Sequence, residues 1–171
     1  MIKIYTARAM TGRIKEEVVK EALQTKEWLE KAGFVVLDPV SAEGVQPTQQ
    51  RLLSSKKQMD SFWPRDKEMI REANIIFDMT PGLKSEGVAH ELGYARYCLW
   101  KPVVRIYPTG QFPPKSSVAY YEDDSVVDSL EFAIEYVLRV HGTFWKRLQW
   151  RLRMLNRCLF KWTIYQLHEF K

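Results

Sequence analysis

The sequence predicts an α/β protein: a Rossmann-like, flavodoxin-like parallel sheet with helices on both faces, plus a long C-terminal amphipathic helix. Short apolar runs alternate along the chain with longer segments whose apolar residues recur at helical spacing. This alternation is typical of a parallel sheet covered by helices. A length of 171 residues and a hydrophobic fraction of 46% fit one such domain. We place it at residues 1–142, with a basic, aromatic helix appended at residues 143–171.

Four apolar runs of strand length are predicted to form the sheet. The second of them is short and ends before Asp38 and Pro39. Polar or turn-forming residues follow each run, as expected where a strand leaves a sheet. The predicted strands cover residues 2–6, 34–37, 75–79 and 103–106.

Four segments with helical spacing separate or follow these strands. Gly33 is placed to end the first helix, and Pro64 to open the second. Ser125 and Asp128 resemble a capping box at the start of the fourth, with Asp in place of the usual Glu. The predicted helices cover residues 14–32, 64–73, 87–99 and 125–141, with loops over residues 41–50 and 107–124.

A ligand site is predicted at one edge of this sheet. In parallel sheets of this kind, ligands bind beyond the carboxyl ends of the strands. Three segments that are far apart in the sequence are expected to meet there, namely residues 7–13, 63–66 and 80–91.

Glu91 is the first candidate for chemistry at that edge. It stands early in a helix that follows a strand, a turn-rich segment and the sequence Ser85-x-Gly87. A Glu on a helix is ordinarily a solvated surface residue. A carboxylate held at the ligand-binding edge can instead attack the anomeric carbon of a sugar and form a glycosyl-enzyme ester.

Asp66 and Tyr5 are the other two candidate catalytic residues, and each has a structural alternative. Asp66 either complements the dipole in a first helical turn or acts as a general acid toward a leaving nucleobase. Tyr5 either packs its ring in the core or orients Glu91 through its hydroxyl. Arg65 is predicted to pair with a structural carboxylate. His90 is predicted to be a packing or rim residue, because successive residues on a helix do not share a face.

Residues suited to a phosphate occur in two loops of the predicted site. Arginines beside a glycine turn can hold a phosphate, and a hydroxyl beside backbone N–H groups forms an anion nest. Ser85 can also simply cap the next helix, and Arg13 is predicted to lie on the surface. The candidate phosphate ligands in these loops are Arg8, Thr11, Gly12, Ser85 and Gly87.

The combination and order of these pieces resemble the nucleoside 2-deoxyribosyltransferase-like superfamily. That group also contains 2'-deoxynucleoside 5'-monophosphate N-glycosidases and CMP hydrolases, and the resemblance covers roughly residues 1–140. The matching pieces are Ile4-Tyr5-Thr6-Ala7 with Met10-Thr11-Gly12, Arg65-Asp66, Ser85-x-Gly87 with Glu91-Leu92-Gly93-Tyr94-Ala95, and Lys101-Pro102-Val103.

The resemblance implies a role for each candidate. Glu91 corresponds to the nucleophile, Asp66 to the residue that contacts the base, and Tyr5 to the residue that orients the nucleophile. Ser85 and Gly87 correspond to the 5'-phosphate loop of the monophosphate hydrolases. Transferases that use free nucleosides carry an acidic residue near the position of Ser85, so the resemblance favours a hydrolase.

The resemblance also implies an assembly. In the monophosphate hydrolases a serine from a neighbouring subunit completes the phosphate site, and Ser116 or Ser117 stands at the matching distance beyond Glu91. A homodimer or larger homo-oligomer with shared sites is therefore expected. Many members have a glycine after the first strand where this chain has Arg8, which adds charge that a phosphate can use.

These observations predict hydrolysis of the N-glycosidic bond of a (deoxy)nucleoside 5'-monophosphate through a glycosyl-enzyme intermediate on Glu91. One alternative is a nucleoside 2-deoxyribosyltransferase that exchanges bases. Another is a non-catalytic nucleotide-binding or membrane-associated protein. No metal or other cofactor is expected, because Cys98 and Cys158 lack metal-ligand spacing and no histidine pair is near. We predict a cytoplasmic protein, with Cys98 buried as apolar volume.

The positive charge of the chain is concentrated in its C-terminal segment. Residues 143–171 carry seven basic residues and one acidic residue, whereas residues 1–142 carry 19 and 20. No nucleic-acid partner is therefore expected for the domain. In the segment, Leu148, Leu152, Leu155, Leu159 and Trp162 repeat at coiled-coil spacing. It is predicted to pack on its own domain or a second subunit. A membrane surface is one alternative, and an acidic partner or nucleic acid is another.

Overall fold

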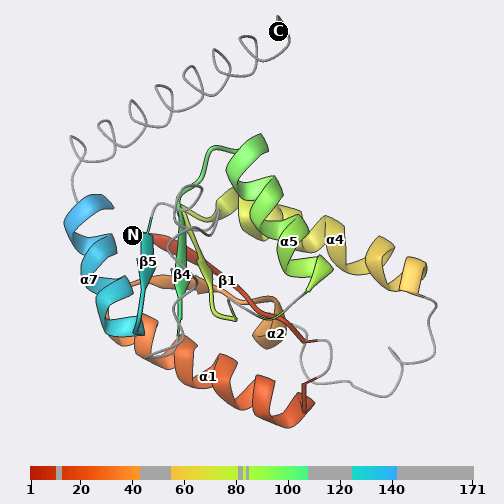
Figure 1. Cartoon of the computed structure of the whole chain (residues 1–171), viewed down its shortest axis with the longest axis horizontal. Helices are drawn as coiled ribbons and strands as arrows, with labels where there is room; N and C mark the ends of the chain where they lie inside the picture. The colour runs from red at the N-terminus through yellow and green to blue at the C-terminus, as the bar shows by residue number, and fades with distance from the viewer. Residues whose placement is uncertain (11–12, 43–54, 81–82, 84, 108–124, 142–171) are drawn as a thin grey trace, which may run out of the picture. The chain divides into compact units, whose positions relative to one another are not determined.

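A computed structural model describes residues 1–10, 13–42, 55–80, 83, 85–107 and 125–141 (Figure 1). Its sheet has five strands, all parallel, in the order β2-β1-β3-β4-β5. The α/β fold predicted from the sequence, with helices on both faces of a parallel sheet, is thereby confirmed. The strands are β1 Lys3–Ala7, β2 Val35–Leu37, β3 Ile75–Asp78, β4 Val103–Ile106 and β5 Ser125–Val127.

The fifth strand corrects the prediction for the segment that begins at Ser125. That residue lies in β5 and aligns with Val104 of β4, so it does not open a helix or form a capping box. The backbone N–H of Tyr107 also donates to the carbonyl of Val127 at 2.8 Å. Two β-branched residues next to a free strand edge favour pairing over a first helical turn.

Helices cover the two faces of the sheet, with α1 on one side and α4 and α5 on the other (Figure 1). Gly33 ends α1 as predicted: it has φ 87°, and Phe34 N–H bonds to the Leu29 carbonyl at 3.1 Å. The helices of this unit are α1 Lys15–Lys31, α2 Pro39–Ala42, α4 Ser55–Glu72, α5 Glu86–Gly93 and the π-helix η1 Tyr94–Cys98.

Pro64 does not open its helix, which is a second correction. Helix α4 begins at Ser55 and passes through the proline. A proline removes one backbone donor, but its fixed φ is compatible with a helix. The preceding turns contain the good helix formers Lys56, Lys57, Gln58 and Met59, which outweigh this loss.

The helix predicted over residues 87–99 is present as α5 and the π-helical turn η1 that follows directly. It stops at Trp100, which has φ 57° in the left-handed region. Cys98, predicted to be buried, is exposed. Lys101 donates its ammonium group to the carbonyls of Arg71 and Ala73 and so caps the end of α4. This contact gives Lys101 of the Lys-Pro pair a structural role. Burial lowers the pKa of the Lys101 ammonium group.

The core on the α4 and α5 side is built from alternate strand residues. Tyr5, Ile76 and Val103 point to this side and pack against Ile70 of α4 and Leu92 of α5. The residues between them, such as Thr6, point to the α1 side. Tyr5 and its neighbours in this set are therefore the strand residues that can take part in a site with α4 and α5.

Residues Met1–Leu130 form one compact unit, and Glu131–Lys171 group separately. In the second unit, α7 runs over Leu130–His141, with Ala133 and Val137 buried along one side. The predicted boundary at residue 142 and the helix of residues 143–171 lie outside the described residues. Within the described ranges, no helix has the length and apolar character needed to cross a membrane.

Candidate functional site

Tyr5, Asp66 and Glu91 come together on the α4 and α5 side of the sheet. Tyr5 reaches this side from β1, Asp66 from α4 and Glu91 from α5. The charges of Glu91 and Asp66 both raise the pKa of Tyr5, and the charge of Asp66 raises that of Glu91. The three residues predicted from the sequence are therefore near enough to affect one another's pKa.

Glu91 holds its proton far more tightly than an ordinary carboxyl group. Burial is the largest cause, and the negative charge of Asp66 is the next; together they raise the pKa of Glu91 to about 8. The charges of Asp78 and Asp38 act in the same direction, while the Tyr5 hydroxyl opposes the shift. At neutral pH, Glu91 is therefore mostly protonated.

The Tyr5 hydroxyl and one oxygen of Glu91 are buried polar atoms that find no hydrogen-bond partner among the described residues. Burial raises the pKa of Tyr5 well above its ordinary value. The Tyr5 phenol is near enough to lower the pKa of Glu91. Within the described ranges, however, neither Tyr5 Oη nor Glu91 Oε2 has a hydrogen-bond partner at bonding geometry. Each such buried atom costs about 1–3 kcal/mol. Unsatisfied groups of this kind are expected where a ligand supplies the missing partner.

Asp66 is held by the arginine that precedes it. Arg65 Nε and Nη2 lie 3.2 and 3.0 Å from Asp66 Oδ1, and the guanidinium carbon is 5.5 Å from the centroid of the Phe62 ring. Arg65 was predicted to pair with a structural carboxylate, but the structure pairs it with a candidate site residue. Asp66 also lies several turns into α4, so the first-turn alternative for it is wrong.

An aromatic contact joins the two helices that carry these carboxylates. The ring of Trp63 on α4 lies 5.7 Å from that of Tyr94, edge to face, and 6.5 Å from that of His90. His90 is exposed and neighbours Glu91 on α5. This agrees with the prediction that His90 is a packing or rim residue.

Ser85 caps α5, as the structural alternative predicted. Its Oγ accepts a hydrogen bond from Val88 N–H at 3.4 Å. Among the residues that the structure describes, a Cβ added to Gly87 would meet only the Ser85 Oγ, at 3.9 Å. The hydroxyl proton of Ser85 is not used by this cap and can still be donated to an anion.

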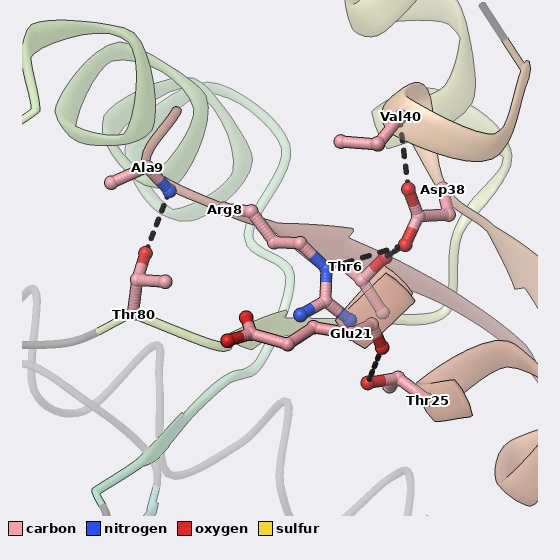
Figure 2. Close-up of polar contacts among 8 residues, drawn as sticks. All are labelled: Thr6, Arg8, Ala9, Glu21, Thr25, Asp38, Val40 and Thr80. Atoms are coloured by element: carbon pink, nitrogen blue, oxygen red, sulfur yellow. Dashed lines mark hydrogen bonds and ion pairs between the residues drawn. The ribbon is translucent and has the colours of Figure 1, made fainter. Parts of the chain in front are cut away.

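Arg8 is buried against Asp38 on the α1 side of the sheet. Its Nε lies 3.5 Å from Asp38 Oδ2, which also accepts a 2.7 Å hydrogen bond from Thr6 Oγ1 (Figure 2). Burial lowers the pKa of Arg8, and Asp38 opposes this shift. Arg8 Nη2 has no hydrogen-bond partner in the described part of the chain. Arg13 pairs with Glu21 at 2.6 Å.

A chain of hydrogen bonds fastens the loop after β1 to the loop after β3. Ala9 N–H donates to Thr80 Oγ1 at 2.7 Å (Figure 2), and Thr80 N–H donates to Asp78 Oδ1 at 3.1 Å. Arg105 Nη1 reaches the other Asp78 oxygen at 3.3 Å. Burial raises the pKa of Asp78, while Arg105 opposes that shift.

These supporting residues were missed by the sequence reasoning. Asp38 was interpreted only as the end of a strand, and Asp78 only as part of one. Their position in the sequence could have indicated a place at the site, because each stands at the carboxyl end of an apolar strand run. Of the predicted site residues, Thr11, Gly12, Ser116 and Ser117 lie outside the described residues. In the described ranges, no three His, Cys, Asp or Glu side chains converge as a metal site.

Removing the Thr80 hydroxyl is expected to destabilise the domain. Thr80→Val leaves the buried Ala9 N–H without its acceptor, so the free energy of unfolding should fall by about 1–3 kcal/mol. Urea unfolding followed by circular dichroism measures the change. Thr80→Ser keeps the hydroxyl and should stay close to wild type; equal losses in both variants would exclude this hydrogen bond as the cause.

The raised pKa of Glu91 should make stability depend on pH. Its folded pKa of about 8 lies above the ordinary 4.5, so the neutral carboxyl contributes fully below 4.5 and its contribution is lost as pH rises through 8. Glu91→Gln cannot ionise. Wild type should therefore lose on the order of 4 kcal/mol relative to this variant between pH 5 and pH 9. Urea unfolding at several pH values tests this, with Glu72→Gln as the control, and parallel curves for wild type and Glu91→Gln would contradict it.

The fold is similar to that of proteins of known structure, including a 2-deoxyribosyltransferase. A 2-deoxyribosyltransferase from Bacillus psychrosaccharolyticus matches with a TM-score of 0.57 and 24% identity, over 78% of this chain and 91% of that one. A conserved protein from Enterococcus faecalis V583 gives 0.56 and 18%, over 81% and 98%. A CMP N-glycosidase from Clostridium botulinum gives 0.48 and 14%, over 79% and 97%. No protein-family model and no curated protein sequence matches the chain. The expected fold, that of the 2-deoxyribosyltransferases, is confirmed by the first of these likenesses.

Proposed function

We propose that this protein hydrolyses the N-glycosidic bond of a nucleoside or 2'-deoxynucleoside 5'-monophosphate, with Glu91 as the nucleophile. The observation that carries the proposal is the unsatisfied buried pair, Tyr5 Oη and Glu91 Oε2, beside a second carboxylate, Asp66. A nucleophile and a general acid held together are what cleavage of a glycosidic bond requires. The shared fold with a 2-deoxyribosyltransferase supports chemistry at the same bond.

In the proposed reaction, ionised Glu91 attacks C1' of the sugar and the bond from C1' to the base breaks. Asp66 assists protonation of the departing base. Water then attacks C1', which releases the sugar phosphate and regenerates Glu91. Tyr5 orients the Glu91 carboxylate during both steps. No step of this path calls for a metal or redox cofactor.

The phosphate is proposed to bind where α5 begins. The Ser85 hydroxyl and Gly87 lie at the start of α5, and a helix N-terminus favours an anion. Thr11 and Gly12 complete the site from the first loop, together with Arg8, whose Nη2 has no described partner. We propose that Ser116 or Ser117 of a second subunit contributes as well, in a cytoplasmic homodimer or larger homo-oligomer.

Base exchange is the second candidate, favoured by the likeness to a 2-deoxyribosyltransferase. Nucleosides and nucleoside monophosphates should be incubated with the full chain, with and without a second free base, and the products separated by chromatography. Free sugar phosphate identifies a hydrolase, and a new nucleoside identifies a transferase. Binding by calorimetry without any product would instead leave a nucleotide-binding protein, and the proposal would be wrong.

A further inference from the structure

The Arg65 guanidinium group forms a salt bridge with Asp66 in a geometry that favours the charged form of that carboxyl group. Two guanidinium nitrogens contact the same oxygen, Oδ1, at 3.0 and 3.2 Å. The Arg65 side chain is 32% exposed and that of Asp66 is 12% exposed, so solvent screens the pair only in part. The Phe62 ring, 5.5 Å from the guanidinium carbon, helps to keep the fork in place.

The other acidic groups that act on Glu91 also have their own cations. Asp78 of β3 pairs with Arg105 at 3.3 Å, and Asp38, which follows β2, pairs with Arg8 at 3.5 Å. Tyr5 of β1 faces Glu91 as a neutral phenol.

Glu91 differs from all three aspartates in having no ion pair within the described ranges. Asp66 has its salt bridge to Arg65, and Asp38 and Asp78 have theirs. Glu91 Oε2 is buried and has no hydrogen-bond partner there. When carboxyl groups act on one another through their charges, a proton goes preferentially to the one without a cation.

We propose that Arg65 is a positioning residue that keeps Asp66 ionised, so that the site holds one proton, which rests on Glu91 and is delivered through Asp66 to the leaving base. This inference rests on the proposed function. It deepens that function by naming the source of the proton that the base takes away. It also explains how a nucleophile that is neutral at rest becomes charged at the moment of attack.

Every proton that moves in the proposed reaction has a donor and an acceptor. The Glu91 carboxyl passes its proton to the Asp66 carboxylate, and Glu91 becomes the anion. As the Glu91 oxygen forms its bond to C1', the electron pair of the C1'–N bond moves to the base nitrogen, which takes the proton from Asp66. Water later attacks C1', the ester bond breaks toward Glu91, and the proton that water loses returns to the Glu91 carboxylate.

The location of the proton can be tested without any substrate. In protein carrying ¹³C-labelled Asp and Glu side chains, the carboxyl carbons are followed by NMR as pH is changed. Glu91→Gln and Asp66→Asn identify the two signals by their loss. We expect the Glu91 signal to titrate near pH 8 and the Asp66 signal at clearly lower pH. In Arg65→Gln, the Asp66 signal should move up by about half to one pH unit.

Two further variants make the test specific. Arg65→Lys keeps the charge and should restore most of the wild-type order. Arg71→Gln removes an exposed arginine of the same helix that pairs with Glu68, and should leave both signals in place. The proposal is overturned if Asp66 takes its proton at higher pH than Glu91, or if Arg65→Gln moves neither signal while circular dichroism shows a normal fold.

The pH dependence of base release provides a second test, besides the NMR titration. A site that works with one proton loses activity when that proton leaves and when a second one binds, so the pH profile of kcat/KM is bell-shaped. Without the Arg65 cation both carboxyls bind protons more tightly, and both limbs should move to higher pH by about half to one unit. Unmoved limbs overturn the proposal. If wild type releases no base while the Glu91 signal still titrates at higher pH than the Asp66 signal, the proposed function is wrong. The role of Arg65 in keeping Asp66 ionised is then still supported.

Discussion

Glu91→Ala is expected to abolish base release, with a fall in rate of at least about 1,000-fold, while nucleotide binding stays measurable. The variant removes the oxygen proposed to bond to C1' but leaves the proposed phosphate loop around Ser85 and Gly87 intact. Release of base is measured by chromatography at saturating nucleoside monophosphate. Binding is measured separately by calorimetry.

Two observations complete this test. Glu72→Ala removes an exposed carboxylate at the far end of α4, paired with Lys3, and should keep wild-type activity. Mass spectrometry of wild-type enzyme quenched during turnover should find the sugar phosphate on the peptide that contains Glu91. Full activity in Glu91→Ala would end the role of this residue as nucleophile.

Asp66→Asn should slow base release by about 100- to 10,000-fold, the usual contribution of a general acid. The amide is nearly the same size, so the fold and the nucleotide affinity should change little. It cannot relay a proton to the base, however. The decisive comparison uses a sugar phosphate whose leaving group departs without protonation, such as a nitrophenolate, on which the variant should lose far less.

The matched control for Asp66→Asn is Glu68→Gln, on the same helix. Glu68 is exposed and pairs with Arg71, so its substitution should leave both substrates unaffected. Equal losses of Asp66→Asn on the two substrates would assign Asp66 a role in binding or structure instead. The loss must also be compared at the pH optimum of each variant, because the substitution changes the charge beside Glu91.

The strands that lie in apolar runs, the short edge strand β2 among them, could be predicted from the sequence, whereas the edge strand β5 could not. The runs around Tyr5 and Ile76 are apolar because both of their faces are covered. Ser125–Val127 is only three residues long and is held by pairing with β4, a partner that is distant in sequence. The same limit explains Pro64, because the turns that precede it, rather than the proline, decided where α4 begins.

The candidate site could be predicted for a topological reason. Strand ends and helix starts meet at one edge of any parallel sheet, so Tyr5 and Glu91 were expected together before their positions were known. The side chains that support them could not be found in this way. The contacts of Asp38 with Arg8 and of Asp78 with Arg105 join separate segments of the chain, and no local sequence pattern predicts such pairs.

By itself, the sequence determined the α/β class and most of the strands, and it predicted the three residues on which the proposed chemistry depends, because periodicity and motif spacing are local properties. Only the tertiary structure raises the pKa of Glu91. That outcome depends on burial of Glu91 and on Asp66 standing beside it with Arg65 as its own cation. Desolvation and Coulomb interactions act through space, and distances in space are set when the chain folds.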